Sequence, residues 1–188
     1  PNANLKTFGE EVGLPKNQMG NSEVGHLNLG AGRIVYQELS RINMSIKNRE
    51  LESNNTLTEA FNYAKKNKKN IHLIGLISNG GVHSHYSHLC ELIRISNNYE
   101  SNIFIHGFTD GRDVDPKASL TDLENLEEYI SDKYCEIASV IGRYYSMDRD
   151  NRWDRTKLAY DLICKGHGKQ TTNFISEIKN SHKENCTD

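Results

Sequence analysis

IHLIGLI, residues 71–77, is a short and almost continuous apolar run, and two runs of the same kind follow it along the chain. They are NIFIHGF at residues 102–108 and EIASVIG at residues 136–142. Apolar runs of this length are typical of strands that are buried on both faces of a parallel sheet. The spacing of the three runs therefore predicts three strands, and the segments between them decide the fold class.

Helical patterns separate and follow these runs. Thr56 and Glu59 have the spacing of a capping box, and the helix that they open ends at the lysine-rich residues 65–69, where cations complement the helix dipole. Further amphipathic helices are predicted around residues 89–96, at 119–130 and at 153–164. Strands that alternate with helices in this way indicate an α/β fold built on a parallel sheet.

Three stretches lack a clear period. Residues 44–55 are polar and are expected to form a linker or an irregular connection. Residues 166–173 and the last ten residues are expected to be loops, with the preceding helix ending near Gly166. The chain begins without Met in a loop-like stretch, and residues 183–188 complete no element, so we expect a piece of a longer protein.

The composition excludes several classes of partner. The 188 residues are 36% hydrophobic and 26% charged, with a formal net charge of -2, so no global basic field favours nucleic acid. No apolar run approaches the roughly 20 residues that span a membrane, and the N-terminal residues lack the apolar segment of a signal peptide. The four cysteines are scattered and form no CxxC pair, which favours a reduced, cytoplasmic protein.

Polar side chains follow each predicted strand. Because ligands bind outside the carboxyl ends of the strands in open parallel sheets, these side chains are expected to meet at one rim. They are His83 and His85 after the first strand, Arg112, Asp113 and Asp115 after the second, and Arg143, Asp148, Arg149, Arg152 and Arg155 after the third. Guanidinium groups match phosphate and carboxylate groups, and a His and an Asp beside them could move protons to and from a hydroxyl. The rim therefore predicts a small substrate that carries a phosphate and a carboxylate.

Two parts of this rim have a second interpretation. His83, His85 and His88 have the spacing HxHxxH of a metal site, but the flanking Ser and Tyr residues also fit a loop that starts a helix. Arg152 and Arg155 lie among aspartates and could form only a surface ion-pair network.

Two other residues of the strand-end loops differ in the functional weight that their positions give them. Arg143 directly follows a predicted strand, which favours a functional role for its side chain. Asp110 and Gly111 could form a plain turn, so Asp110 carries less functional weight than Arg112 and Asp113, which follow it.

Ser22 lies in the glycine-rich segment GNSEVGHLNLGAGR, residues 20–33. It lacks the G-x-S-x-G frame of a nucleophile elbow, and the glycines at 30–32 do not complete a dinucleotide fingerprint. His26 follows four residues later, alongside the hydroxyl rather than in line with it on a helix. At a loop-to-helix junction, the helix N-terminus and a metal could stabilise an alkoxide, which activates a phosphorylatable serine without a catalytic triad.

Taken together, the long motifs resemble one family. LPKNQMGNSEVGHLNLGAG with RIVYQ, then NGGVHSH, DGRDVDP and IASVIGRYYSMDRDNRWDR, occur in this order in cofactor-independent (2,3-bisphosphoglycerate-independent) phosphoglycerate mutases. The resemblance covers almost the whole chain. It implies an isomerase that interconverts 3-phosphoglycerate and 2-phosphoglycerate through a phosphoserine intermediate, in glycolysis and gluconeogenesis.

The resemblance also implies a domain organisation. Members of the family have a domain of the alkaline phosphatase superfamily that holds two metal ions, usually Mn²⁺, and a transferase-like domain inserted in it. Residues 1–36 would be a small piece of the phosphatase-like domain, and residues 37–188 part of the substrate-binding domain. The full-length protein would be a cytoplasmic monomer that binds a small molecule and neither nucleic acid nor a membrane.

Site residues are implied motif by motif. Ser22 matches the serine that accepts the phosphoryl group and also binds metal. Substrate-binding roles are implied for His83, Arg112, Asp113, Arg143 and Arg149, and Asp113 would also assist proton transfer at the glycerate hydroxyls.

The chain departs from the family pattern in its length, in the motifs it lacks and at one position. It is less than half the usual length, and it has Asn79 where SDGG is usual. It lacks the aspartate and histidine metal motifs upstream and downstream, an arginine-rich substrate motif and a lysine. We therefore expect residues 1–188 to be inactive by themselves. The alternatives are a non-catalytic module that binds phospho-acids, and a metal-dependent phosphatase or phosphopentomutase, although those relatives lack the paired DGRD and GRYYSMDR loops.

Overall fold

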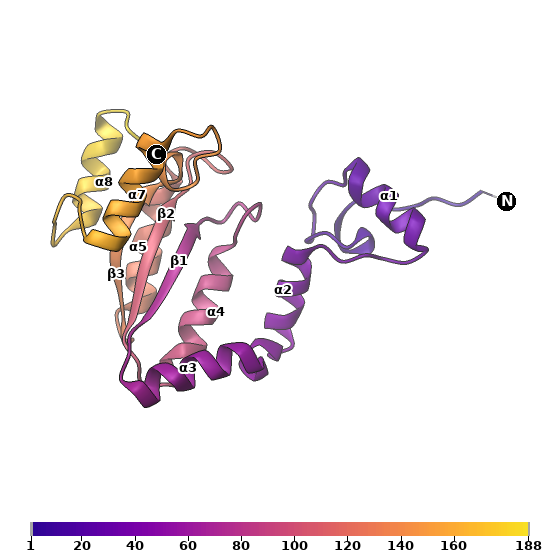
Figure 1. The fold of residues 1–188 in the computed structure, drawn as a ribbon. Helices are drawn as coiled ribbons and strands as arrows, with labels where there is room; N and C mark the ends of the chain where they lie inside the picture. Colours follow the sequence, from indigo (N-terminus) through magenta and orange to yellow (C-terminus); the bar gives the residue numbers. More distant parts are fainter. Residues whose placement is uncertain (1, 188) are drawn as a thin grey trace. The chain divides into compact units, whose positions relative to one another are not determined.

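The computed structural model describes residues 2–187. They form two compact units, the first ending at Asn54 and the second beginning at Asn55 (Figure 1). The assignment of residues 1–36 and 37–188 to two domains stays a prediction, because compactness alone does not show to which domain a segment belongs.

The first unit is small and helical. Its elements are the 3₁₀ turns η1 (Gly9–Val12) and η2 (Glu50–Ser53) and the helices α1 (Ser22–Ala31) and α2 (Glu38–Lys47). Val12, Leu14 and Val24 form its small buried core. The prediction of a linker or an irregular connection at residues 44–55 is confirmed only in part. The boundary between the two units falls here, between Asn54 and Asn55, but the stretch is not irregular, because it contains the last turn of α2 and all of η2.

The second unit is built on a sheet of three parallel strands in the order β1-β2-β3. Its elements are α3 (Asn55–Asn67), β1 (Ile71–Ile77), α4 (Tyr86–Asn97), β2 (Ile103–Thr109), α5 (Ala118–Ile130), β3 (Cys135–Gly142), α6 (Arg143–Ser146), α7 (Trp153–Lys165) and α8 (Phe174–Lys183). The predicted α/β class and all three strands are confirmed, each strand within one residue of its expected start. The carboxyl ends of the strands lie at one edge of the sheet, as parallel pairing requires.

The C-terminal segment corrects the sequence prediction. The last ten residues were expected to be a loop, but residues up to Lys183 belong to α8. The Asn173 side chain caps this helix by accepting a hydrogen bond of 3.0 Å from the amide of Ser176, and Phe174 and Ile178 pack against the core. The helical period of this segment depends on only a few apolar residues. Because the other residues are polar, the sequence shows no clear amphipathic pattern here.

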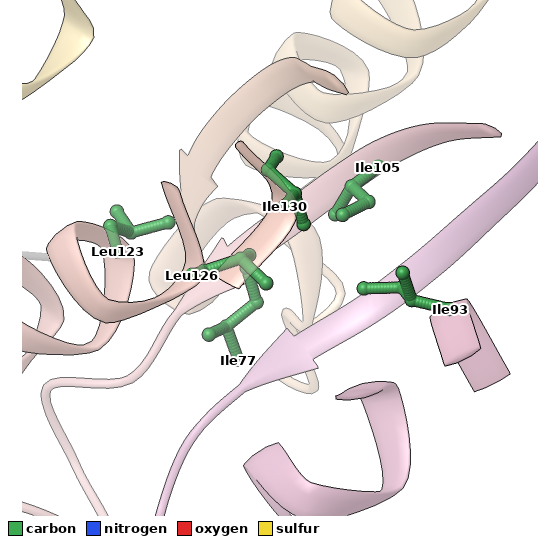
Figure 2. Close-up of a cluster of buried hydrophobic side chains, with 6 residues drawn as sticks. All are labelled: Ile77, Ile93, Ile105, Leu123, Leu126 and Ile130. Atoms are coloured by element: carbon green, nitrogen blue, oxygen red, sulfur yellow. The ribbon is translucent and has the colours of Figure 1, made fainter. Parts of the chain in front are cut away.

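The core of the second unit lies between the sheet and two helices (Figure 2). Ile77 and Ile105 come from β1 and β2, Ile93 comes from α4, and three residues of α5 complete the cluster: Leu123, Leu126 and Ile130. Burial of a Leu or Ile side chain contributes about 1.5–3 kcal/mol, so this cluster is a main source of stability for the sheet that carries the strand-end loops.

A row of polar side chains crosses all three strands. His72 Nδ1 of β1 lies 2.9 Å from His106 Nε2 of β2, and His106 Nδ1 lies 2.8 Å from the Ser139 hydroxyl of β3. Burial of His106, with a smaller contribution from the charge of His72, lowers the pKa of His106 below its usual value. The folded protein therefore favours the neutral imidazole.

Acid should weaken this unit through His106. Because its folded pKa lies below the unfolded value of 6.5, the neutral form stabilises the fold above pH 6.5 and the contribution is lost as pH falls below it. We expect His106→Gln to make the loss of stability between pH 8 and pH 5 shallower, measured by urea unfolding at each pH. The exposed His167 offers the matched control, His167→Gln, and equal slopes in both variants would contradict the assignment.

Two further observations concern the chain's environment. None of the helices that the structure describes is long and apolar enough to cross a membrane. Within the same residues, the four cysteines form no disulfide; they are Cys90, Cys135, Cys164 and Cys186.

Candidate functional site

The loops that follow the three strands enclose one hollow. Its volume is about 370 Å³, and it lies at the carboxyl edge of the sheet, as expected for a site in an open parallel sheet. The residues that line it are His83, Arg112, Arg143, Tyr144, Met147, Asp148, Arg149, Asp150 and Arg155. Four of the five side chains predicted to bind substrate thus lie around this hollow, and the fifth, Asp113, contacts two of them.

Asp110 directly follows β2 and is almost completely buried. Its Oδ2 accepts a hydrogen bond of 2.6 Å from the Ser78 hydroxyl, and its Oδ1 accepts bonds of 3.0 Å from the amides of Arg112 and Asp113. Arg143 Nη1 donates a fourth, of 2.8 Å, to Oδ1. Burial opposes ionisation, but these bonds outweigh it and lower the pKa of Asp110 to about 2.

Arg143 is held by two carboxylates. Its side chain is only 8% exposed, and the same Nη1 that bonds Asp110 also lies 2.6 Å from Asp113 Oδ2. Burial acts to lower the pKa of the guanidinium, but the bonds to Asp113 and Asp110 raise it on balance. Arg143 therefore stays charged, and much of its charge is neutralised within the protein.

Arg155 also lines the hollow and is engaged in a similar way. Its Nη1 lies 3.2 Å from Asp148 Oδ1 and 3.5 Å from Asp150 Oδ2, and its guanidinium carbon lies 3.8 Å from the centre of the Tyr144 ring. Arg152, by contrast, pairs with exposed Asp154 and does not line the hollow. The interpretation of a surface ion-pair network therefore fits Arg152, whereas Arg155 is part of the wall.

Arg112 and Arg149 differ from these two arginines. Both side chains are exposed and line the hollow. Across residues 2–187, the structure gives neither guanidinium a hydrogen bond or an ion pair. These two cations are therefore available to an anionic ligand without breaking an internal contact.

The histidines after β1 do not form a metal site. Among residues 2–187 there is no group of three or more His, Cys, Asp or Glu side chains that could hold a metal ion. His85 instead caps α4, because its Nδ1 accepts a bond of 3.2 Å from the amide of Ser87. His83 is half exposed, and its Nε2 lies 3.7 Å from Asp113 Oδ2.

Asn79 joins the first loop to α5. Its side-chain amide donates a hydrogen bond of 2.5 Å to Oδ1 of Asp122, which is buried. Burial raises the pKa of Asp122, the bond from Asn79 counteracts this, and the charge of Asp110 adds to the rise. An aspartate at position 79 would place a second carboxylate against Asp122, so the uncharged amide avoids a repulsion in this chain.

Ser22 is the first residue of α1, in the first unit. Asn21 caps the helix by accepting a hydrogen bond of 2.9 Å from the amide of Val24, and the Ser22 side chain is exposed. Ser22 also lines a largely apolar hollow of about 950 Å³ within this unit. The predicted loop-to-helix junction is thus where the structure places it.

His26 is not arranged as a base for Ser22. Its Nδ1 lies 2.7 Å from the Ser22 carbonyl oxygen and 3.2 Å from the Ser22 hydroxyl. A carbonyl oxygen only accepts hydrogen bonds, so the shorter contact requires Nδ1 to carry the proton. A protonated Nδ1 cannot take the proton of the hydroxyl, and activation of Ser22 needs another source.

Gly20 fixes the approach of the chain to Ser22. A Cβ at this position would lie 1.8 Å from the Thr7 carbonyl oxygen, whereas a Cβ on Gly25 in α1 would meet nothing within 4 Å. We expect Gly20→Ala to destabilise the first unit by about 2 kcal/mol or more, because the backbone must move apart. The matched variant Gly25→Ala should instead be neutral or stabilising by about 1 kcal/mol at most. Thermal unfolding of the two variants tests this, and equal stabilities would show that the contact is not rigid.

Sequence reasoning underrated one residue of this site. Asp110 was discounted because Asp-Gly is a common turn, yet its carboxylate contacts loops from all three strands. The available signal was its position, directly after the last residue of β2, where an inward side chain lies under the strand-end loops.

The described residues do not fit a two-metal site. Ser22 is predicted to bind a metal ion, but the part of the chain described by the structure contains no group of three or more His, Cys, Asp or Glu side chains that could complete such a site.

Comparison with known proteins gives one consistent result. Residues 42–188 match the family model described as "BPG-independent PGAM N-terminus". The chain is 56% identical to the 2,3-bisphosphoglycerate-independent phosphoglycerate mutase of Flavobacterium psychrophilum and 50% identical to that of Bacteroides fragilis. Each alignment covers 100% of this chain but only 37% and 38% of the relative, so the chain spans little more than a third of their length.

A solved structure agrees with these relatives. A phosphoglycerate mutase of Leishmania mexicana, determined at low cobalt concentration, superposes with a TM-score of 0.82 at 31% identity. The match covers 96% of this chain and 34% of that protein. The strand-end motifs, the parallel sheet and the family match over residues 42–188 together show that the chain belongs to the 2,3-bisphosphoglycerate-independent phosphoglycerate mutase family.

Proposed function

We propose that this chain provides the phosphoryl-accepting serine and substrate-binding loops of a 2,3-bisphosphoglycerate-independent phosphoglycerate mutase. Such an enzyme is an isomerase that moves a phosphoryl group between the two hydroxyl oxygens of glycerate. The observation that carries the proposal is the hollow at the strand ends, where arginines from two different loops and a histidine from a third meet. A small molecule with both phosphate and carboxylate groups is the ligand that this arrangement fits.

The arginines divide into two groups in this proposal. Arg112 and Arg149 bind the anionic groups of the substrate, because no internal carboxylate competes for their guanidinium groups within residues 2–187. Arg143 joins them with the donors that its bonds to Asp110 and Asp113 leave unused. Arg155 shapes the wall of the hollow through Tyr144 and Asp148. Bidentate contacts from two arginines would fix the orientation of a phosphoglycerate.

Phosphoryl transfer is proposed to proceed through Ser22. The bond between phosphorus and a substrate oxygen breaks as one forms to Ser22 Oγ, which gives up its proton while the leaving oxygen gains one. The phosphoryl group then returns to the other hydroxyl of the held glycerate, which loses its proton as the Ser22 hydroxyl is restored. Asp113 is the proposed acceptor and donor of the hydroxyl protons, with His83 at 3.7 Å from its Oδ2. Two Mn²⁺ ions are proposed as cofactors, with Ser22 as one ligand and the remaining ligands outside the described residues.

The proposed setting follows the same family. The substrate is a small molecule, 2- or 3-phosphoglycerate, and the enzyme is proposed to act as a monomer in the cytoplasm. Residues 1–188 by themselves are expected not to isomerise phosphoglycerate, because they contain no cluster for the metal ions in the part described by the structure.

Binding to the arginines can be tested on the chain itself. We expect isothermal titration to show 3-phosphoglycerate binding, and Arg149→Met to weaken it by about tenfold or more because a charge-assisted bidentate contact is lost. Arg152→Met is the matched control, since Arg152 pairs with Asp154 outside the hollow. Equal weakening in both variants would indicate attraction by overall charge and count against the site.

A second candidate is a binding module that holds phospho-acids without turnover. The lack of a metal cluster among the described residues favours it for these residues in isolation. A chimera distinguishes the two candidate functions. In it, residues 1–188 replace the matching segment of the Flavobacterium psychrophilum enzyme, to which this chain is 56% identical. An active chimera supports the mutase, whereas a folded chimera that binds phosphoglycerate without activity supports the module.

A further inference from the structure

Asp110 is the point at which the three strand-end loops meet. Its carboxylate receives the Ser78 hydroxyl from the loop after β1, two amides from its own loop, and the guanidinium of Arg143 at the end of β3. Its side chain is 0% exposed, so it does not reach a ligand itself. A role for Asp110 in binding must therefore act through another residue.

The contacts of Arg143 show which residue that is. Only Nη1 bonds the two carboxylates, at 2.8 Å to Asp110 and 2.6 Å to Asp113. Nε and Nη2 make no hydrogen bond within residues 2–187, and they are not among the buried polar atoms without a partner. The guanidinium is thus anchored at one end, while its remaining donors are accessible to a ligand in the hollow that Arg143 lines.

We propose that Asp110 is a positioning residue, which fixes the guanidinium of Arg143 in the orientation that presents its free donors to the phosphoglycerate. The inference rests on the proposed function, since it concerns how the same hollow binds its ligand. The Asp110 carboxylate supplies the negative charge that holds the Arg143 guanidinium. The Ser78 hydroxyl orients this carboxylate by donating a hydrogen bond to Oδ2. Asp113 cannot replace this anchor, because it is partly exposed and also contacts His83.

Pre-orientation is the physical advantage. An arginine side chain free to rotate loses conformational entropy when it binds, and a guanidinium already fixed by a carboxylate loses less. The Asp110 carboxylate also links the three loops. Because it accepts a hydrogen bond from the backbone amide of Arg112, it fixes the position of Arg112 relative to Arg143. Loss of the Asp110 charge should consequently weaken ligand binding more than loss of a surface carboxylate that lies outside the hollow.

The test compares three variants of the chain. Asp110→Asn removes the charge and keeps the shape, and Ser78→Ala removes one orienting bond. Asp132→Asn is the control, because Asp132 is an exposed carboxylate that pairs with Lys133 and does not line the hollow. Binding of 3-phosphoglycerate is measured by titration, and melting temperatures establish the folded fraction. The exchange of the Arg143 guanidinium protons with water is followed in ¹⁵N-resolved spectra. A general loss of stability would not change the exchange rate of this one side chain selectively.

We expect Asp110→Asn to weaken binding by about tenfold or more and to abolish the slowly exchanging Arg143 signal. Ser78→Ala should reduce both the affinity and the Arg143 signal by a smaller factor, which keeps the test decisive if Asp110→Asn folds poorly. Asp132→Asn should match the wild type. If the wild-type chain binds 3-phosphoglycerate but Asp110→Asn and Ser78→Ala bind it as tightly as Asp132→Asn, or if the Arg143 signal is unchanged, the positioning role alone is overturned. Failure of the wild-type chain to bind 3-phosphoglycerate would overturn the proposed function, and the positioning role with it.

Discussion

Replacement of Ser22 by alanine is expected to reduce mutase activity by more than about 10³-fold, because the phosphoryl group loses its acceptor on the enzyme. The measurement uses the chimera in which residues 1–188 replace the matching segment of the Flavobacterium psychrophilum enzyme. A coupled assay of 2-phosphoglycerate formation gives the rate. Binding of 3-phosphoglycerate should be little changed, because the arginines that we propose to bind it lie in other loops.

His26 provides the control for this prediction. Its Nδ1 donates to the Ser22 carbonyl oxygen and is not available as a base, so His26→Gln should retain most of the activity. A loss in His26→Gln as large as that in Ser22→Ala would show that the imidazole activates the serine. Activity of the Ser22→Ala chimera close to that of its parent would eliminate Ser22 as the acceptor.

Replacement of Arg143 by methionine is expected to reduce the free energy of unfolding of the second unit by about 3–5 kcal/mol, which is typical when one partner of a buried ion pair is removed. Methionine retains much of the side-chain volume, but it leaves Asp110 and Asp113 facing each other without a cation. Chemical denaturation at pH 7 measures the loss. Arg152→Met should have little effect, because Arg152 pairs on the surface.

The pH dependence of this loss has a definite sign. In the wild type, the lowered pKa of Asp110 stabilises the fold above the unfolded value of 3.8, and this contribution disappears as pH falls towards 2. In Arg143→Met the carboxylate lacks its cation, so its pKa should rise and acid should relieve the repulsion. The stability difference between the two proteins should therefore shrink from pH 7 to pH 3, and a constant difference would mean that Arg143 acts through packing alone.

The fold was largely predictable, because its signals are local. The apolar runs at 71–77, 102–108 and 136–142 lie on the three strands, and helices separate them as expected for a parallel sheet. The helix Phe174–Lys183 was missed because its period depends on a few apolar residues among many polar ones. The end of α2 was missed for the same reason, since residues 44–55 are mainly polar.

The sequence predicts where the site lies, but not which of its charged side chains pair with one another. Parallel topology brings the strand-end loops together, so the placement of His83, Arg112, Arg143 and Arg149 around one hollow follows from the strand order. Which arginine is free depends on contacts between loops that are distant in sequence. Arg143 meets Asp110 from 33 residues away, and no local pattern indicates such a contact.

The most direct test of the proposed mutase function is the location of the phosphoryl group during turnover. The chimera is incubated with 3-phosphoglycerate and Mn²⁺, quenched in acid and digested, and the peptide that contains Ser22 is analysed by mass spectrometry. The proposed function predicts one phosphate on Ser22, absent without substrate and absent in the Ser22→Ala chimera. Turnover with an unmodified Ser22, or with the phosphate on another residue, would contradict it.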